Sequence, residues 1–322
     1  MTSPPTVLTF GEALVGYGST ENNLRTATQF TRFPGGADLN VAVGLTRLGI
    51  RTIWASVLGN DAHGDYLADV VGQLGITPLI RRAGGPTALM FKAGGLDGDP
   101  EVLQVRHRTA FAQHADALLT GDVLALEGID HVHLTGITLG VSPVVRAVAL
   151  ALLEAAIAAR VSVSFDPNLR LNLWPDRDEM RTVVNTFAAG ATVVMPGLGE
   201  GQLLTGHDNP EGVAKTYLDA GTREVVIKLG AEGAQAWTAD GQTAKSRPFA
   251  VTPIDTVGAG DGFAAGYVAA FLAAGNLQER VDQGAAVGAL ATTRRGDLDA
   301  MPEGKEVDAL LSSTPPALQN AK

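Results

Sequence analysis

The run Asp255-Thr-Val-Gly-Ala-Gly-Asp261 stands directly before a segment with a helical pattern, predicted to begin at Gly262. Small residues let a backbone approach a ligand closely, and the free N–H groups at a helix start attract anions. A carboxylate there could take a proton from a hydroxyl while the N–H groups stabilise charge on a phosphoryl group. The run therefore predicts phosphoryl transfer with Asp261 as the general base. An ordinary Gly-rich turn, with Asp261 as the helix cap, is the alternative.

Two other nucleotide-binding patterns are missing from the sequence. No GxxxxGK string followed by Ser or Thr occurs, which argues against a P-loop enzyme. The glycines around Gly258 lack the GxGxxG spacing and lie near the end of the chain instead of after its first strand. A nicotinamide-linked dehydrogenase is therefore not predicted.

Outward from this run, β-rich segments alternate with helical patterns along most of the chain. Strands separated by helices predict a mainly parallel sheet that is covered on both faces, with ligands beyond the carboxyl ends of the strands. The predicted strands are residues 6–10, 52–57, 131–134, 161–165, 192–195, 224–228 and 234–238. The predicted helices are residues 39–48, 63–74, 143–159, 178–188, 210–220, 262–273 and 277–292.

Two segments break this alternation, at about 14–34 and about 87–108. Both have the character of an antiparallel ribbon, and the second contains the turn Leu96-Asp-Gly-Asp-Pro100. We expect them to form one small β unit that is inserted in the α/β core and acts as a lid. Residues 1–322 are then a single domain.

The composition limits the class of function. The chain has 322 residues, 45% hydrophobic and 18% charged, which is typical of a globular protein. A net charge of −10 argues against nucleic-acid binding, and the lack of cysteine excludes thiol chemistry and disulfides. The most apolar window, 144–159, carries Arg146 and Glu154, so it predicts a core helix and no membrane span. We expect a cytoplasmic protein.

A second glycine-rich string is Phe33-Pro-Gly-Gly-Ala37, which precedes a predicted helix and is followed by Asn40. The backbone at Gly35 and Gly36 can approach a ligand closely, and the Asn40 amide is available for hydroxyl groups. This string predicts a site for a polyhydroxylated ligand. A turn with a helix cap is the alternative.

A third string, Phe165-Asp-Pro-Asn-Leu-Arg170, follows a predicted strand and therefore lies at the ligand-binding edge of the sheet. Arg170 could clamp a carboxylate or a phosphate oxygen in a forked geometry. The alternative is a structural salt bridge between Arg170 and Asp166 or another carboxylate.

Other polar residues are weaker candidates. Arg106 and Arg108 end the second ribbon and could touch a substrate, or they could be solvated strand charges. The string from Lys228 to Gly233 could line a nucleotide with its backbone, or it could be a plain turn. Glu200 could order Mg²⁺ through water, or lie on a surface helix. His131 and His133 alternate on one strand without a carboxylate or a third histidine near them, so they are predicted to be core or edge residues.

Together these strings resemble the PfkB (ribokinase-like) carbohydrate kinase family over nearly the whole chain. The spacing of Gly35-Gly36, Asn40-Val-Ala42, Gly49 and Gly59 is similar to the N-terminal signature of that family, with one extra residue before Asn40. Residues 255–268 fit its C-terminal signature throughout. Two signatures in the expected order are far more specific than either alone.

This resemblance implies a three-layer α/β/α core with a mainly parallel sheet, plus a small β-sheet lid. It implies transfer of the γ-phosphoryl group of ATP to a primary hydroxyl that Asp261 deprotonates, with Mg²⁺ bridging the phosphates. The N–H groups of Gly258, Ala259 and Gly260 would form an anion hole. The residues implied to face ATP are Asn168, Arg170, Lys228, Leu229, Gly230, Ala231, Gly233, Gly258, Ala259, Gly260 and Ala285.

Within the family, the sequence is most similar to 2-keto-3-deoxygluconate (KDG) kinases, which implies conversion of KDG to its 6-phosphate. The strings that carry this likeness are Gly35-Gly-Ala-Asp-Leu-Asn-Val-Ala42, His133-Leu-Thr-Gly-Ile-Thr138 with Ser142-Pro143, the Arg170 string with Leu173-Trp174, and Arg294-Arg-Gly-Asp297. The residues predicted to bind the sugar acid are Gly35, Gly36, Asn40, Arg106, Arg108, Arg170, Asp261 and Asp297.

The sequence also departs from that group. Gln104-Val105-Arg106 stands where KDG kinases often have Tyr-Tyr-Arg, and Gly197-Leu-Gly-Glu200 replaces the family pattern Asn-x-x-Glu. Fructokinases share the Asp-Pro-Asn-Leu-Arg string, so a fructokinase or another hexose or sugar-acid kinase is the alternative. A non-catalytic sugar-binding regulator is a remote one. The two lid arginines favour a sugar acid, because a neutral hexose gains little from them.

Two further expectations concern partners. Ribbon edges are usually covered, which predicts a homodimer through the lid. The resemblance also allows a monovalent cation near Asp255.

Overall fold

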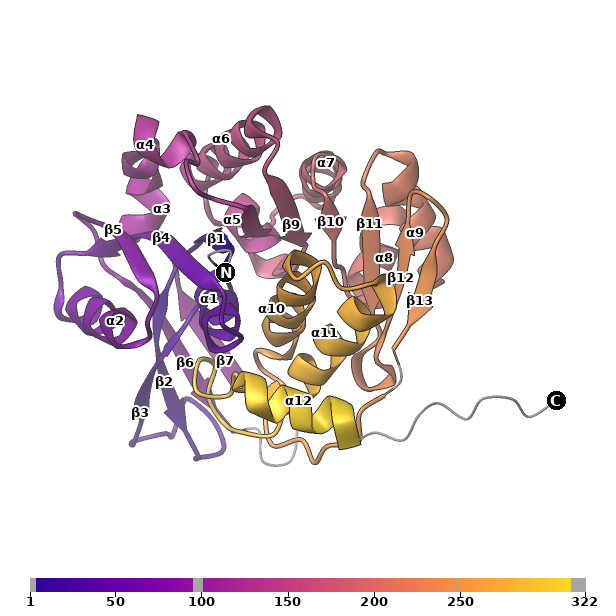
Figure 1. Cartoon of the computed structure of the whole chain (residues 1–322). Helices are drawn as coiled ribbons and strands as arrows, with labels where there is room; N and C mark the ends of the chain where they lie inside the picture. The colour runs from indigo at the N-terminus through magenta and orange to yellow at the C-terminus, as the bar shows by residue number, and fades with distance from the viewer. Residues whose placement is uncertain (1–3, 95–100, 247, 314–322) are drawn as a thin grey trace.

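The computed structural model describes residues 4–94, 101–246 and 248–313. Its main feature is a nine-stranded sheet in the order β13-β12-β11-β10-β9-β8-β1-β4-β5 (Figure 1). Every pair between β11 and β5 is parallel, while β12 and β13 are added antiparallel at one edge. The strands are β1 (Thr6–Phe10), β4 (Arg51–Gly59), β5 (Thr77–Ala83), β8 (His131–Thr135), β9 (Ser162–Asp166), β10 (Val193–Val194), β11 (Glu224–Lys228), β12 (Ala234–Thr238) and β13 (Thr243–Lys245).

Helices cover both faces of this sheet and complete the three layers visible in Figure 1. One face carries α3 (Ala110–His114), α4 (Gly121–Leu124), α5 (Gly136–Val141), α6 (Pro143–Ala159), α7 (Arg177–Ala189), α8 (Leu198–Thr205) and α9 (Pro210–Asp219). The other carries α1 (Ala37–Arg47), α2 (Ala62–Gln73), α10 (Ala259–Leu272) and α11 (Leu277–Ala291), and α12 (Gly304–Ser313) packs on α11.

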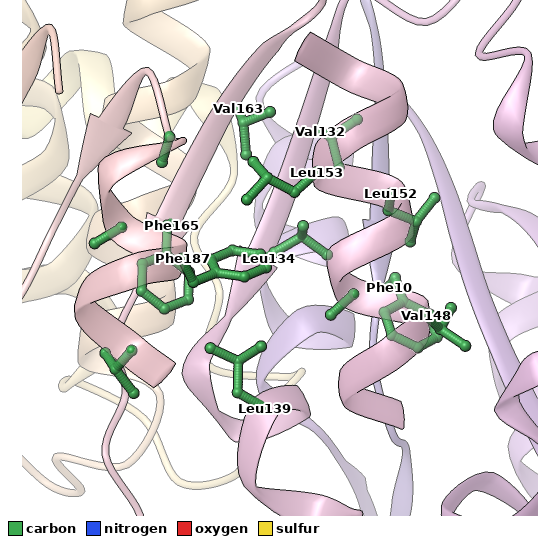
Figure 2. Close-up of a cluster of buried hydrophobic side chains, with 14 of the residues drawn as sticks. Phe10, Val132, Leu134, Leu139, Val148, Leu152, Leu153, Val163, Phe165 and Phe187 are labelled. Atoms are coloured by element: carbon green, nitrogen blue, oxygen red, sulfur yellow. The ribbon is translucent and has the colours of Figure 1, made fainter. Parts of the chain in front are cut away.

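The largest core cluster lies on the first face, where strand residues meet α6 and α7 (Figure 2). The rings of Phe165 and Phe187 lie 4.7 Å apart between their centroids. Alternate residues of the same strands point to the other face, where His131 Nε2 and His133 Nδ1 lie 2.7 and 2.8 Å from Ser164 Oγ. Both histidines have no exposed surface, which confirms the prediction that they are core residues.

A small sheet in the order β3-β2-β6-β7 stands beside the large one. Its strands are β2 (Leu14–Ser19), β3 (Thr31–Gly35), β6 (Ala88–Ala93) and β7 (Glu101–Val105). β2–β3 and β6–β7 are antiparallel, as expected for two ribbons, and a parallel pairing of β2 with β6 joins them. The predicted turn at 96–100 lies outside the described residues. The predicted fold class, a parallel α/β core with a small β sheet, is confirmed.

Several elements differ from the sequence prediction. Helix α10 begins at Ala259 instead of Gly262, so Asp261 lies inside its first turn. The edge strands β5 and β13 were not predicted, since β5 reads Thr-Pro-Leu-Ile-Arg-Arg-Ala without apolar alternation. The apolar window at 144–159 is the core helix α6. Across the described part of the chain, no helix combines the length and apolarity that a membrane crossing needs.

Candidate active site

The candidate site lies beyond the carboxyl ends of β1, β8, β9 and β11, next to the start of α10. From β1 the chain builds outward to β4 and β5, and then returns to add β8 to β11 on the other side of β1. Open α/β sheets bind ligands at the carboxyl edge where the strand order reverses in this way. Topology therefore gathers segments that are far apart in the sequence.

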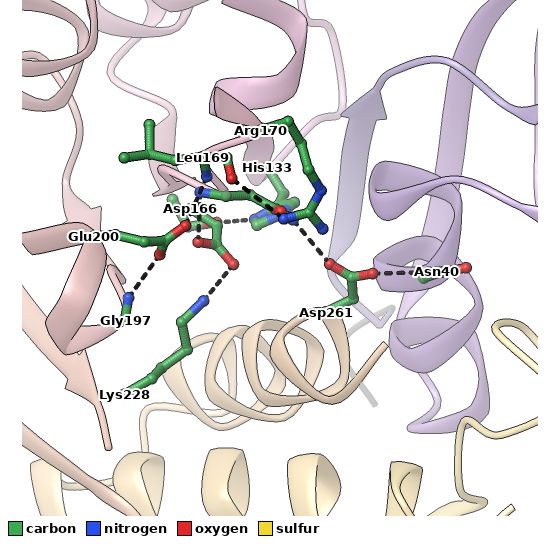
Figure 3. Close-up of polar contacts among 11 residues, drawn as sticks. Asn40, His133, Asp166, Leu169, Arg170, Gly197, Glu200, Lys228 and Asp261 are labelled. Atoms are coloured by element: carbon green, nitrogen blue, oxygen red, sulfur yellow. Dashed lines mark hydrogen bonds and ion pairs between the residues drawn. The ribbon is translucent and has the colours of Figure 1, made fainter. Parts of the chain in front are cut away.

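Asp261 is at the centre of this edge, held by two amides (Figure 3). Asn40 Nδ2 of α1 donates to its Oδ2 at 2.7 Å, and Asn168 Nδ2 donates to its Oδ1 at 3.3 Å. The cap of α10 is Gly258, with φ of 81°, a left-handed conformation that suits glycine. The side chain of Asp261 therefore does not cap the helix, and the alternative of an ordinary capped turn does not hold.

Burial raises the pKa of Asp261 to about 7, and the negative charge of Asp166 adds to this effect. The Asn40 hydrogen bond and the charges of Arg170 and Lys228 act in the opposite direction. An acid with this pKa is partly ionised near neutrality, which is the range in which a general base accepts and releases protons most effectively. The electrostatics therefore suit the role predicted for Asp261.

A second acid, Asp38 on α1, is buried beside Asp261. Burial and the nearby Asp261 carboxylate hold its pKa well above the usual value, although Thr135 Oγ1 donates to its Oδ2 at 3.1 Å. Its Oδ1 and the Oδ1 of Asn40 have no hydrogen-bond partner among the described residues. Buried polar atoms left in this way are few in native structures, and a catalytic role or a bound water or ion is one explanation for them.

Lys228 at the end of β11 reaches under the start of α10. Its Nζ lies 2.5 Å from Asp166 Oδ2, and a Cβ placed on Gly260 would be 3.5 Å from the same Nζ. Burial opposes the charge on this ammonium, but the carboxylates of Asp166 and Glu200 outweigh it, so the pKa of Lys228 is raised. A half-buried ammonium with a raised pKa thus lies next to the predicted anion hole.

Glu200 makes two hydrogen bonds to backbone N–H groups, and its predicted role in ordering Mg²⁺ through water stays a prediction. Its Oε2 accepts from Gly197 N at 2.8 Å and its Oε1 from Leu169 N at 2.6 Å, so it caps α8 and fixes the loop that carries Asn168 and Arg170. Burial raises its pKa, and Asp166 contributes to the same direction. Both oxygens already have partners, so any role in ordering Mg²⁺ runs through water. No cluster of three or more metal-binding side chains occurs among the residues that the structure describes.

Arg170 is exposed and close to two acids. Its charge lowers the pKa of both Asp261 and Asp297, yet within the described chain it forms no ion pair and only a 3.4 Å hydrogen bond to the Leu169 carbonyl. The predicted alternative partner, Asp166, pairs with Lys228 instead. The guanidinium is therefore free to bind an anion.

Asp297 and Gly35 lie next to each other. Any Cβ at Gly35 would lie 2.6 Å from Asp297 Oδ2, so only glycine leaves this carboxylate its place. Burial raises the pKa of Asp297 to about 6. The backbone at Gly36 lies next to the loop that follows β1, where a Cβ would be 2.5 Å from the Glu12 carbonyl oxygen.

Arg106 is buried, whereas Arg108 is exposed. Arg106 Nε donates to Glu12 Oε2 at 2.6 Å, and Thr109 Oγ1 holds the other Glu12 oxygen at 3.0 Å. A guanidinium has five N–H donors, so this ion pair leaves donors for a ligand. Arg108 forms no ion pair with a described residue, and its contact with a substrate stays a prediction.

The segment predicted to line a nucleotide is a short exposed turn after β11. Leu229 N donates to the Gly233 carbonyl at 2.8 Å, which closes the turn through Gly230, Ala231 and Glu232. Ala285 is buried on α11 in the same cluster as Phe263 of α10. Of the anion-hole N–H groups, Ala259 N makes only a long bond of 3.3 Å to the Thr256 carbonyl.

The sequence prediction missed several acids of this site: Glu12, Asp38 and Asp166. Two of them could have been recognised from the sequence, because Asp38 lies inside the Gly-Gly-Ala-Asp-Leu-Asn string and Asp166 begins the Asp-Pro-Asn string. A carboxylate inside a ligand-edge string marks a site more strongly than one on a helix surface. Glu12 lacks such a signal, because only the fold reveals its partner Arg106, 94 residues away.

Comparisons with known proteins identify the family of the chain. The model of the pfkB family carbohydrate kinases matches residues 5–304. The chain is 36% identical to the 2-dehydro-3-deoxygluconokinase of Bacillus subtilis (strain 168), covering 95% of each chain, and 32% identical to fructokinase-1 of Zea mays, covering 95% of this chain and 97% of that one.

Solved structures share the fold. A PfkB protein from Polaromonas sp. JS666 superposes with a TM-score of 0.86 at 37% identity, covering 95% of this chain and 99% of that chain. An E. coli chain solved in complex with ATP and Mg²⁺ has a TM-score of 0.86 at 24% identity, covering 96% of this chain and all of that one. At that identity the second likeness concerns the fold alone.

Proposed function

The chain belongs to the pfkB family of carbohydrate kinases, and from this premise we propose that it phosphorylates a primary hydroxyl of a sugar acid, with KDG as the acceptor and ATP as the donor. The observation that carries the proposal is that Asp261, whose pKa is raised, lies near Arg170, an arginine without an ion pair among the described residues. Asp261 has a pKa near 7, and Arg170 stands close enough to influence it without an ion pair among the described residues.

In the proposed mechanism, ionised Asp261 accepts the proton of the attacking hydroxyl. Asn40 and Asn168 orient its carboxylate through the two hydrogen bonds described above. The N–H groups of Gly258, Ala259 and Gly260 at the start of α10 stabilise charge on the transferred phosphoryl group, and the Lys228 ammonium beneath Gly260 adds to that field. Mg²⁺, when bound with ATP, neutralises the phosphates.

The substrate class rests on the arginines. A sugar acid offers a carboxylate that Arg170, and the free donors of Arg106, can bind in a forked geometry. Asp297, next to Gly35, accepts hydrogen bonds from sugar hydroxyls. Fructose is the second candidate, because a curated fructokinase is 32% identical over nearly the whole chain. A neutral ketose leaves the guanidinium of Arg170 without a counter-charge, which is why we place it second.

Further parts of the proposal concern the nucleotide site and assembly. ATP would lie along the turn from Lys228 to Gly233 and beside Ala285, with Glu200 reaching Mg²⁺ only through water. By family likeness, a monovalent cation would bind near Asp255. ATP as donor fits a cytoplasmic location.

We also propose a dimer through the small sheet. Its support is the edge strand β7, where Val102, Leu103 and Val105 are 47%, 54% and 43% exposed. A monomer in sedimentation at micromolar concentration would contradict it.

The direct test is an ATP-dependent phosphorylation panel with KDG, its galactonate epimer, fructose, gluconate and ribose. We expect the largest kcat/KM with KDG or its epimer, and a product phosphorylated at the primary hydroxyl. A larger kcat/KM with fructose moves the chain to the fructokinases while leaving the kinase mechanism intact. No phosphorylation of any acceptor overturns the proposal.

A further inference from the structure

An ion pair joins the small sheet to the loop that leads into the predicted anion hole. Lys92 on β6 places its Nζ 3.1 and 3.4 Å from the two carboxylate oxygens of Asp255. The two residues are 163 positions apart, and their side chains are only 20% and 21% exposed. Neither side chain takes part in the phosphoryl-transfer mechanism proposed above, although family likeness places a monovalent cation near Asp255.

Asp255 is the anchor of that loop. Its Oδ1 accepts from Val257 N at 3.1 Å, and Val257 immediately precedes Gly258, the cap of α10. Its backbone N donates to the Thr292 carbonyl at the end of α11, also at 3.1 Å. One carboxylate therefore sets the path of the backbone into Gly258, Ala259 and Gly260. Its third attachment is Lys92, which comes from the small sheet.

Lys92 also balances the charge of a second acid. Burial raises the pKa of Asp297, the Lys92 ammonium acts in the opposite direction, and the charge of Asp255 raises it further. These three residues line a cavity of about 620 Å³ between the small sheet and the loops at 253–256 and 295–299. Figure 1 shows the loop before α12, which carries Asp297, passing beside the small sheet.

We propose that Lys92 is a positioning residue that makes a competent anion hole dependent on the small sheet. Through Asp255 it holds the backbone of residues 257–260 in the conformation that binds the phosphoryl group. The small sheet thus acts as a lid whose contact with the core assembles the catalytic loop. This inference rests on the proposed kinase function, and it concerns kcat more than substrate affinity.

Another lysine–aspartate pair has a different placement. Lys215 and Asp219 also form a lysine–aspartate pair, at 2.8 Å, but on one helix, with side chains 72% and 64% exposed. Exposed pairs of that kind contribute little to stability, and this one joins residues of a single helix instead of two separate elements. The pair therefore provides a matched control, because the same substitution can be made in both lysines.

The test compares Lys92→Met, Lys92→Arg, Asp255→Asn and the double variant with Lys215→Met, using the acceptor that the wild type phosphorylates best. We expect Lys92→Met to lower kcat by about tenfold to a hundredfold with a smaller change in KM, as displaced catalytic groups do. Lys92→Arg should recover most of the loss, and Lys215→Met should match the wild type. Because Lys92 acts through Asp255, the double variant should be no slower than the slower single variant.

A second readout does not depend on turnover. Hydrogen exchange of the amides at 257–260 should be faster in Lys92→Met than in the wild type, and unchanged in Lys215→Met. Wild-type kcat in Lys92→Met together with unchanged exchange overturns the inference while leaving the proposed kinase intact. Fully multiplicative losses in the double variant also overturn it, because Lys92 would then act independently of Asp255. A wild type inactive on every acceptor defeats the proposed function, and the exchange result alone then decides whether Lys92 holds the loop.

Discussion

The two ends of the large sheet each bury a carboxylate, and they treat it differently. At the amino end, Glu224 begins β11 and is 9% exposed; Tyr267 Oη donates to its Oε2 at 2.8 Å and Arg280 forms an ion pair with its Oε1. At the carboxyl end, Asp261 is 8% exposed, but its described partners are two amides and no cation bonds it directly.

Equal burial therefore has two meanings. A carboxylate that has a cation and a hydroxyl on its two oxygens, as Glu224 has and as Glu12 has beside the site, is satisfied, and its charge serves the fold or orients the cation. A carboxylate held by neutral amides keeps a raised pKa and remains available to a proton. A cavity alone does not distinguish a functional carboxylate from a structural one. The amino end of the sheet also has a cavity, of about 490 Å³, lined by Glu224 and Arg280. The partners of the buried acid mark the site.

The largest expected effect comes from Asp261→Asn. We expect kcat to fall by roughly a thousandfold or more, since the general base is lost, while ATP binds with unchanged affinity. Folding should not suffer. The pKa of Asp261 is raised above its unfolded value, so its favourable contribution is present at low pH and is lost as pH rises through about 7. At pH 8 the variant should be as stable as the wild type or more so. Near-normal kcat would contradict the mechanism.

Arg170→Ala should have the next largest effect, and it should depend on the acceptor. We expect kcat/KM for KDG to fall by about a hundredfold, because a charged hydrogen-bond partner of the carboxylate is removed. The loss with fructose should be several-fold smaller. Steady-state kinetics on both acceptors, with ATP saturating, measure the difference. Equal losses would mean that Arg170 serves ATP or the loop, and not the sugar acid.

A pH profile tests the poised acid without any substitution. The base must be ionised to accept a proton, so kcat/KM should fall by about tenfold per pH unit below pH 7 and level off above it. Asp297, whose pKa is about 6, would steepen the acid limb if its charge is also needed. The profile should be measured with ATP saturating at every pH. A profile flat from pH 5.5 to 8 would remove Asp261 from the role of base.

The sequence predicted most of the central strands because parallel strands are buried on both faces and read as apolar runs. β5 was missed because it lies at the edge of the sheet, where Arg81 and Arg82 and a proline interrupt the apolar pattern. The start of α10 was placed three residues late because Ala259 and Gly260 carry no helical signal of their own.

The candidate site divides in the same way. Asp261, Asn40, Asn168 and Arg170 were found because each lies in a string with local glycine, proline or strand-end signals. Lys92, Glu12 and the use of Asp166 by Lys228 were not found, because long-range contacts between separate segments define them. Glu200 is the opposite case. It lies in a string that resembles a family pattern, but the sequence did not show that both of its oxygens accept hydrogen bonds from backbone N–H groups.

The smallest effect on activity, and the complement of Asp261→Asn, is expected from Glu224→Gln at the amino end. The change leaves the Arg280 guanidinium without its counter-charge in a site where the two side chains are only 12% and 19% exposed. We expect a loss of about 2 kcal/mol in the free energy of unfolding, measured by urea denaturation. Values of kcat and KM should match the wild type, because Glu224 lies at the opposite end of β11 from Lys228. Asp219→Asn, in an exposed pair, should change stability by less than about 0.5 kcal/mol. If Glu224→Gln instead lowers kcat at full stability, the two ends are coupled, and a satisfied carboxylate is no longer evidence of a structural role.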